Sequence, residues 1–228
     1  MMKLSIVMPV LDEAAEIEAA LSALAPYRRR GVEVIVVDGG SSDGTPELAR
    51  PLADRVIAAQ RGRAEQMNAG AAAATGDVLL FLHADTRLPE NADRLVLDGL
   101  ARSGRGWGRF DVRIDGGGLL GVVATTMNAR SRLTGIATGD QALFVTRAAF
   151  DSAGGFPPIA LMEDVALSAR LKRIGRTCAL RARVTTSARR WRRHGTLRTV
   201  LLMWRLRLAY FLGADPAKLA RAYGYAER

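Results

Sequence analysis

The first half of the chain alternates short apolar runs with stretches whose hydrophobic residues recur every three or four positions. The apolar runs predict buried strands, and the three-to-four spacing predicts amphipathic helices. Strands that alternate with helices imply right-handed crossovers and a mainly parallel sheet, so the pattern predicts an α/β fold. The predicted strands span 4–10, 32–38, 55–59 and 77–85, and the predicted helices span 14–24, 64–74 and 89–103, with a short helix after Thr45.

The alternation changes after Ser103. Residues 104–118, GRGWGRFDVRIDGGG, predict one extended strand bounded by glycines, either at a sheet edge or in a mixed β element. A helix over 119–133, a strand over 141–146 and an amphipathic helix over 162–175 follow. No linker, repeat or low-complexity tract interrupts the chain, which predicts a single domain over 1–228.

The last predicted helix, within a helical segment of about 196–224, is amphipathic and basic. Three arginines make it a poor bilayer span. Its apolar side packs on the rest of the domain or on a second subunit, which we favour, or it lies on an anionic membrane surface. The apolar side carries Leu197, Val200, Leu201, Trp204, Leu208 and Phe211, and the basic residues are Arg198, Arg205 and Arg207.

Composition narrows the class of protein. With 228 residues and 49% hydrophobic residues, the chain can bury the core of one ordered domain. The single cysteine, Cys178, excludes an intramolecular disulfide and a Cys/His zinc site, and it lies in an apolar strand-like stretch. The net charge of +10 attracts phosphates, but the few aromatic residues are not interleaved with the basic ones, which argues against sequence-specific nucleic-acid binding.

The amino-terminal apolar run is interrupted by Pro9 and closed by Asp12 and Glu13. It therefore predicts a first strand rather than a secretory signal. No run reaches the roughly 18 apolar residues of a membrane span, and we expect a cytoplasmic protein.

Candidate chemistry follows three predicted strands, where ligands of open α/β sheets bind. His83-Ala84-Asp85 follows the apolar run DVLLFL, and Asp85 supplies a hard oxygen ligand for Mg²⁺ or Mn²⁺ on a diphosphate. The alternative is an aspartate that caps a loop. His194, among the arginines of RRWRRH, is a second metal ligand, a neighbour of a diphosphate clamp, or a surface histidine.

Asp38 follows the second strand and precedes a glycine-rich turn. The segment MPVLDEAAE lacks the glycines of a dinucleotide site, so Asp38 is expected to bind a base or ribose, with Gly40 and its neighbours letting the backbone approach the nucleotide. The alternative is a turn that only starts a helix.

Glu163 and Asp164 begin an amphipathic helix after a glycine- and proline-rich loop. A carboxylate there can act as general base toward an acceptor hydroxyl. The alternative is a pair of acids that complement the helix dipole.

With these residues in place, the chain resembles the family 2 glycosyltransferases through SIVMPVLDE, VIVVDGGSSDGT, RGRAEQMNAG, GDVLLFLHADT, GDQALFV and MEDV. The His-Ala-Asp-Thr form, GRFDVRI and RRWRRHG are similar to a bacterial subgroup labelled by arsenosugar biosynthesis or by radical-enzyme and selenoprotein-type neighbours. The resemblance implies a GT-A fold and transfer of a sugar from a nucleotide-diphosphate sugar, with a UDP-sugar favoured and Mn²⁺ or Mg²⁺ as cofactor.

The resemblance also assigns roles residue by residue. Asp85 matches the last acid of the metal motif, whose first place is taken by His83, and Asp164 matches the base, with Glu163 beside it. Ser187 replaces the glutamine that precedes the Arg-Trp pair in processive members. The residues implied to contact the nucleotide, its phosphates or the acceptor are Pro9, Val10, Glu13, Asp38, Gly40, Arg61, Gln66, Asn68, Ala84, Arg190 and Trp191.

Two other functions stay open. A sugar-phosphate nucleotidylyltransferase has a related sheet but needs a glycine-rich basic loop after the first strand, which MPVLDEAAE lacks. A non-catalytic basic module on a membrane or nucleic acid is the second alternative.

Overall fold

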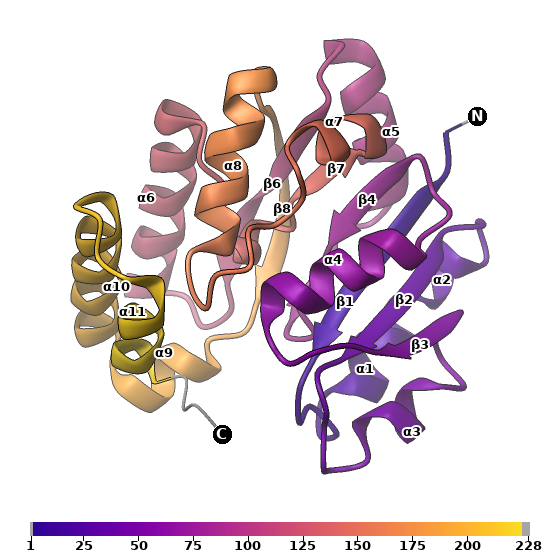
Figure 1. Ribbon diagram of the computed structural model, residues 1–228, viewed down its shortest axis with the longest axis horizontal. Coiled ribbons are helices and arrows are strands. Elements are labelled where there is room, and N and C mark those ends of the chain that lie inside the picture. Colours follow the sequence, from indigo (N-terminus) through magenta and orange to yellow (C-terminus); the bar gives the residue numbers. More distant parts are fainter. Residues whose placement is uncertain (1, 225–228) are drawn as a thin grey trace.

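The computed structural model describes residues 2–224, and within them the strands form one sheet of order β3-β2-β1-β4-β7-β6-β8-β5 (Figure 1). The strands are β1 Leu4–Val10, β2 Glu33–Asp38, β3 Arg55–Ala58, β4 Val78–Phe81, β5 Thr86–Arg87, β6 Trp107–Ile114, β7 Phe144–Thr146 and β8 Cys178–Thr186. The helices are α1 Ile17–Ser22, α2 Ala25–Arg28, α3 Thr45–Ala49, α4 Arg63–Ala73, α5 Ala92–Ser103, α6 Leu119–Thr134, the 3₁₀ turn η1 Gly139–Gln141, α7 Arg147–Ser152, α8 Glu163–Ile174, α9 Arg189–His194, α10 Thr196–Phe211 and α11 Pro216–Tyr223.

The predicted parallel sheet is confirmed for β3, β2, β1 and β4, which pair parallel in that order. The continuous apolar runs of β1, β2 and β4 are buried on both faces, as a sheet covered by helices on both sides requires, whereas β3 is only partly buried. At one end of the first pair Val10 lies opposite Asp38, so β1 and β2 finish at the same edge.

The strand β7 reverses direction within this sheet. It pairs antiparallel with both β4 and β6, and β6 pairs parallel with β8. The first residues of β7 therefore lie at the edge where the parallel strands end. The strand predicted over 104–118 exists as β6 in this mixed part, but a position at the sheet edge is wrong, because β6 lies between β7 and β8.

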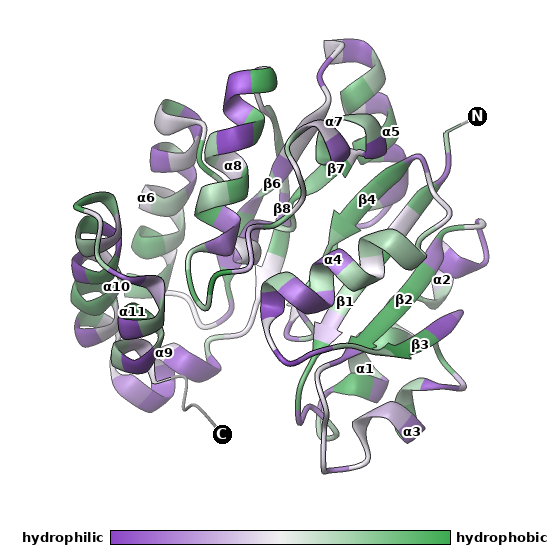
Figure 2. Cartoon of the chain, viewed as in Figure 1, coloured by the Kyte–Doolittle hydropathy of each residue, from purple (hydrophilic) through white to green (hydrophobic). Residues whose placement is uncertain are grey.

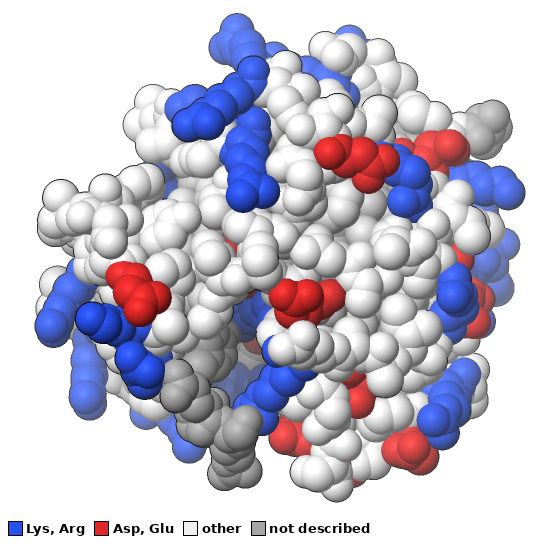
Figure 3. Space-filling model, in the orientation of Figure 1, with Lys and Arg blue, Asp and Glu red and all other residues white. Residues whose placement is uncertain are grey.

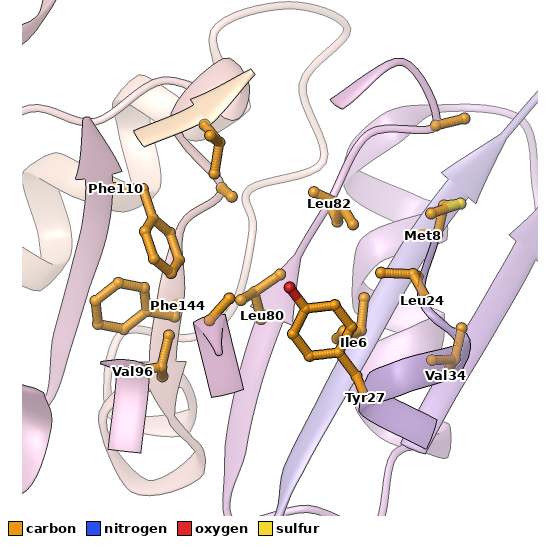
Figure 4. Close-up of a cluster of buried hydrophobic side chains, with 14 of the residues drawn as sticks. Ile6, Met8, Leu24, Tyr27, Val34, Leu80, Leu82, Val96, Phe110 and Phe144 are labelled. Atoms are coloured by element: carbon orange, nitrogen blue, oxygen red, sulfur yellow. The ribbon is translucent and has the colours of Figure 1, made fainter. Parts of the chain in front are cut away.

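Helices cover both faces of the sheet. On one face, α1, α5 and α6 pack Leu21, Val96 and Leu120 onto a cluster that includes Ile6 and Leu80 (Figure 4). On the other face, α4, α7 and α8 pack Met67, Phe150 and Leu167 against the opposite sides of the same strands. The approach of α4 is close: a Cβ on Gly70 would lie 2.3 Å from Cγ1 of Val7.

The helix predicted over 14–24 is shorter in the structure, where α1 covers only 17–22, and a separate short helix, α2, follows at 25–28, outside the predicted bounds. The Glu13 amide donates to Oγ1 of Thr45 and the Ala14 amide donates to a carboxylate oxygen of Asp43, both at 2.9 Å. These bonds tie the segment after β1 to the loop after β2, and the helix begins only at Ile17. Residues 13 and 14 are therefore bonded to the loop at the end of the sheet and do not form the first turn of the helix.

The predicted carboxy-terminal helix is present as α10, at one side of the molecule beside α6 and α11 (Figure 1). It contacts the domain through Thr199 and Leu206, both 3% exposed, with Leu202 and Ala209 partly buried. These positions fall three or four residues apart, on a side that the sequence pattern did not single out.

The expected packing of the other, more apolar side on the rest of the domain is wrong. Hydrophobic residues stand at this edge of the molecule (Figure 2), and Leu197, Leu201, Trp204, Leu208 and Phe211 are 57–67% exposed. Contact of this side with a second subunit or a membrane stays a prediction. Among residues 2–224, no helix has both the length and the apolar character needed to cross a bilayer.

Candidate functional site

A cleft of about 870 Å³ lies where β1 and β4 end, between α4 and the segment α9–α11. Within the described part of the chain, the structure brings most of the predicted site residues to its walls. Those that line the cleft are Pro9, Val10, Glu13, Arg61, Gln66, Ala84, Asp85, Arg190, Trp191 and His194.

Three predicted ligand-binding residues, Asp38, Gly40 and Asn68, are not among the residues that line this cleft. The Asp38 carboxylate accepts hydrogen bonds from the amides of Gly40 and Ser41 and from the Ser41 hydroxyl. The Asn68 side chain exchanges two hydrogen bonds with the backbone of Phe156, at 2.8 and 2.9 Å. The Asp38 side chain thus holds the turn after β2, and the Asn68 side chain ties α4 to the segment at Phe156. Contact of either side chain with a nucleotide stays a prediction.

Gln66 combines a place in the cleft wall with a structural contact. Its Nε2 donates to the carbonyls of Val10 and Val37, at 2.7 and 2.8 Å, and the side chain is 4% exposed. It thereby holds the ends of β1 and β2 together beneath the cleft, so a substitution here would alter the floor as well as any ligand contact.

Asp85 faces the cleft from the turn after β4. Its backbone carbonyl accepts from the Ser187 amide at 3.1 Å, and its carboxylate accepts a long hydrogen bond of 3.3 Å from the Thr86 hydroxyl. The side chain keeps carboxylate oxygens available toward the cleft. Its negative charge reaches Glu13 and Asp140, where it opposes ionisation of both carboxyls.

The acids around Asp85 fit a cation that binds together with a phosphate ligand. Among residues 2–224, no group of three or more His, Cys, Asp or Glu side chains is placed to hold a metal ion alone. Mg²⁺ is usually held by one or two carboxylates, with phosphate oxygens and water completing its shell. Asp85 and its neighbour Asp140 suit that arrangement, whereas ligation by the exposed His194 stays a prediction.

His83 and Asp140 line the cleft, and Gly139 lies directly beside the His83 ring. Nδ1 of His83 lies 3.9 Å from Oδ1 of Asp140. Burial, and then the positive charge of Arg63, lower the pKa of His83 to about 3, so its imidazole is neutral at pH 7 and this contact is no ion pair. Desolvation and the negative charge of Asp85 raise the pKa of Asp140 to about 6.

Glu163 and Asp164 line a second cavity, a groove of about 520 Å³ between α6, α8 and α10. The Asp164 carboxylate accepts from the Gly139 amide and from the Val165 amide, each at 2.7 Å, and these bonds fix its orientation. Glu163 is 4% exposed, and burial together with the charge of Asp164 raises the pKa of Glu163 to about 7. Arg63 approaches Glu163 at 4.0 Å.

The cleft and the groove meet. Arg63, His83, Asp140, Trp191, Met203 and Tyr223 line both of them. The two cavities therefore adjoin along these residues, His83 and Asp140 among them, and Asp164 lines only the groove.

The carboxy-terminal segment closes the cleft with basic side chains. Nη2 of Arg189 lies 3.3 Å from both carboxylate oxygens of Glu13, which joins α9 to the loop after β1. Arg190 donates to the carbonyl of Tyr223 at 2.8 Å, and its Cζ stands 3.6 Å from the centre of the Tyr223 ring. Arg193 and Arg221 also line this wall, so anionic ligands meet several positive charges there.

Sequence reasoning missed Asp140, Gly139 and Arg63. Residues directly after predicted strands are candidates for such a site, but Asp140 comes before β7, which runs antiparallel to β4. Antiparallel pairing brings the start of β7 to the edge where β4 ends. The signal was present in the run GDQALFV, an acid beside a glycine immediately before an apolar strand.

A mainly parallel sheet covered by helices, with acids and a basic wall where its strands end, defines the GT-A class of fold. The chain belongs to glycosyl transferase family 2, whose model matches residues 5–147, more than half of the chain.

Curated relatives match shorter segments. The PGL/p-HBAD biosynthesis glycosyltransferase of Mycobacterium bovis (strain BCG / Pasteur 1173P2) is 40% identical over 99 residues, which is 40% of this chain and 38% of the relative. The succinoglycan biosynthesis protein ExoA of Rhizobium meliloti (strain 1021) is 38% identical over 111 residues, 42% of this chain and 32% of ExoA. The match thus spans less than two fifths of the length of these relatives. These relatives do not show the bacterial subgroup that the sequence resembles, and membership of that subgroup stays a prediction.

Solved structures agree on the fold. The mannosyltransferase PcManGT from Pyrobaculum calidifontis, in complex with GDP-Man and Mn²⁺, superposes with a TM-score of 0.67 at 24% identity, over 98% of this chain and 69% of that one. S. aureus TarS 1-349, in complex with UDP-GlcNAc, gives a TM-score of 0.68 at 18% identity, over 82% and 58% of the two chains. The GT-A fold predicted from the sequence is confirmed.

Proposed function

We propose that the protein transfers a sugar from a nucleotide-diphosphate sugar to an acceptor hydroxyl, with inversion at the sugar carbon. The observation that carries this proposal is the junction of two cavities at His83 and Asp140. The basic cleft suits a nucleotide diphosphate, and the groove brings an acceptor to Asp164. Relatives named as glycosyltransferases and fold neighbours that hold GDP-Man or UDP-GlcNAc support the same substrate class.

Asp164 acts as the base in this scheme. The acceptor hydroxyl gives its proton to the Asp164 carboxylate while its oxygen bonds to the sugar carbon. The bond from that carbon to the diphosphate oxygen breaks, and its electron pair leaves with the diphosphate. Inversion requires attack from the face opposite the leaving group, and separate cavities for donor and acceptor are compatible with that direction.

The chain's remaining groups bind and orient. Arg189, Arg193 and His194 face the diphosphate from the carboxy-terminal wall, and Pro9 and Val10 line the nucleotide end. His83, which is neutral, lines both cavities beside Asp140 and adds no charge there. Asp85, with Asp140, would hold Mn²⁺ or Mg²⁺, which when bound neutralises charge on the departing diphosphate. A uridine nucleotide is our favoured donor base, and a cytoplasmic location stays part of this proposal.

Calorimetric titration of the protein with UDP and GDP, with and without Mn²⁺, tests the donor site. We expect nucleotide binding that strengthens with Mn²⁺ and that loses this dependence in Asp85→Asn. Asp98→Asn, an exposed acid on α5, is the matched control. Equal binding with and without Mn²⁺, in both wild type and Asp85→Asn, would refute the metal role, and no nucleotide binding at all would refute the donor class.

A further inference from the structure

The acceptor groove differs in chemistry from the donor cleft. Its walls are formed largely by apolar side chains of α6 and α10, among them Leu119, Val122, Leu197, Val200 and Trp204. Leu119 and Val122 are each 58% exposed and Leu197 is 67% exposed, although they lie beside a polar catalytic end. A sugar or another fully polar acceptor gains little from such walls, whereas a hydrocarbon chain gains by covering them.

Two arginines interrupt these apolar walls. Arg130 of α6 and Arg207 of α10 both line the groove, and they lie near enough for their charges to repel. Nε and Nη2 of Arg130 and Nε of Arg207 are buried without a hydrogen-bond partner in the described chain. Buried guanidinium nitrogens without partners are costly, and an anionic oxygen would satisfy them.

The arginine pair lies on the groove wall near the acids of the site. Arg130 is within electrostatic reach of Asp164, and Arg207 is within reach of Asp140. Trp204 and Leu197, which also line the groove, are 66% and 67% exposed, and Leu201 and Leu208 of the same helix are exposed as well. An occupant would therefore have its anionic group near the reacting end and its apolar part directed toward the outer surface.

We infer that the acceptor is an anionic amphiphile, a lipid-like molecule whose charged group contacts Arg130 and Arg207 and whose hydrocarbon chain lies between α6 and α10. That this ligand is the acceptor rests on the proposed function. Its chemical class is argued from the groove itself. Basic side chains also gather around α10 and α11, at the left of the view in Figure 3, which suits the approach of such a molecule.

Alkyl phosphates of eight, ten and twelve carbons, kept below their micelle-forming concentrations, are suitable probes. Binding can be followed by calorimetry and by the fluorescence of Trp191 and Trp204, which line the groove. We expect affinity to rise about threefold to fourfold per added methylene. Inorganic phosphate alone and neutral alkyl maltosides of the same length are expected to bind at least tenfold more weakly than the twelve-carbon phosphate.

Matched variants separate the groove from the rest of the surface. Arg130→Gln and Arg207→Gln are expected to lower alkyl phosphate affinity at least tenfold, and Leu197→Asn to flatten the dependence on chain length. Arg198→Gln on α10 and Leu133→Asn on α6 are the controls, because both residues are exposed and neither lines the groove. Unchanged affinity in the groove variants, or equal losses in the controls, would overturn the inference.

Three other occupants give different results, and each overturns it. Binding to phosphatidylglycerol vesicles without binding of dispersed alkyl phosphate indicates a membrane-surface contact. A dimer in sedimentation velocity that Leu197→Asn dissociates indicates a second copy on the groove. Loss of Mn²⁺-dependent UDP or GDP binding in Arg130→Gln and Arg207→Gln assigns the arginines to the donor diphosphate.

The same titrations distinguish failure of the inference from failure of the proposed function. Wild-type protein that binds Mn²⁺ and nucleotide but not alkyl phosphate retains the proposed function and loses the inferred acceptor class. Protein that binds alkyl phosphate but no nucleotide loses the proposed function, while the ligand class of the groove is supported.

Discussion

The backbone amide of Gly139 donates a hydrogen bond of 2.7 Å to Oδ2 of Asp164. This contact joins the turn before β7 to the first turn of α8 and aims the Asp164 carboxylate at the junction of the cleft and the groove. The absence of a side chain on residue 139 is part of the arrangement. A Cβ there would lie 2.4 Å from Cε1 of His83 and 2.7 Å from its Nε2, so a substitution must displace the imidazole.

Gly139→Ala should therefore impair turnover more than nucleotide binding. Its φ is not positive, so an alanine is compatible with the backbone, and the amide that bonds Asp164 is retained. A displacement of about 1 Å at a reacting centre can cost on the order of 10²-fold in rate. Steady-state kinetics and nucleotide titration check this, with Gly121→Ala on α6 as the control, because an added Cβ there would meet no other part of residues 2–224 within 4 Å beyond its own helix. Full activity in Gly139→Ala would show that the position of His83 is unimportant.

Asp164→Asn should remove the base while leaving the fold intact. The Gly139 and Val165 amides donate to different carboxylate oxygens, so the asparagine carbonyl oxygen can replace only one of these acceptors, and the side chain cannot take a proton from an acceptor hydroxyl. Loss of a positioned base costs roughly 10²–10⁴-fold in rate. We expect turnover to fall by that amount while Mn²⁺-dependent nucleotide binding and the midpoint of urea unfolding change little. If transfer stays near the wild-type rate, or if the variant simply unfolds, Asp164 serves the helix start and not the chemistry.

Much of the fold could be predicted because the hydrophobic pattern of each segment matches the burial of that segment in the folded domain. The run EVIVVD is apolar at nearly every position, and a strand buried on both faces of a helix-covered sheet requires that. The turn at Asp38 and the acids at Asp85 and Asp164 were likewise found from their places at the ends of elements.

The features that could not be predicted depend on the direction of a strand in the sheet and on contacts between residues far apart in the sequence. The sequence does not show that β7 runs antiparallel to β4, so Asp140 was not placed beside Asp85. The side of α10 that packs was also misjudged. Leu206 is buried against Leu161 and Leu219, while the more apolar side, with Trp204, stays exposed. Hydrophobicity alone does not distinguish a core face from a binding face.

Asp111→Asn should destabilise the protein strongly. The Asp111 carboxylate pairs with Arg109, whose side chain is fully buried, and with Nη2 of Arg132 at 2.7 Å. Burial lowers the pKa of Arg109, and the negative charge of Asp111 opposes that shift. The charged guanidinium is therefore unfavourable in this buried position unless Asp111 compensates it. Removing the negative partner leaves a buried charge uncompensated, which costs about 3–5 kcal/mol.

Urea denaturation at pH 7 measures this loss, and Asp98→Asn provides the comparison. Asp98 pairs with Arg102 at 3.5 Å, but the two side chains are 62% and 83% exposed. An exposed pair contributes about 0–1 kcal/mol. Similar losses in the two variants would mean that water reaches the Arg109 guanidinium and that the pair behaves as a surface contact.

Glu163→Gln should stabilise the protein at alkaline pH, and the direction follows from proton linkage. Burial, then the charge of Asp164, raise the pKa of Glu163 from 4.5 to about 7, so the folded chain binds a proton between these values that the unfolded chain releases. The stability of the wild type therefore decreases as pH rises from about 4.5 through 7.

Glutamine at position 163 stays neutral at every pH and does not lose this stability. The variant should gain at most about 3 kcal/mol at pH 8, and the gain should shrink as pH falls and vanish below about pH 4, where Glu163 is protonated in both states. Urea unfolding at pH 5 and pH 8 measures the difference, with Glu47→Gln, an exposed acid 3.2 Å from Arg50, as the control expected to show no such trend. A variant that is less stable than wild type at pH 8 would show that Arg63, 4.0 Å away, holds the ionised carboxylate more strongly than burial opposes it.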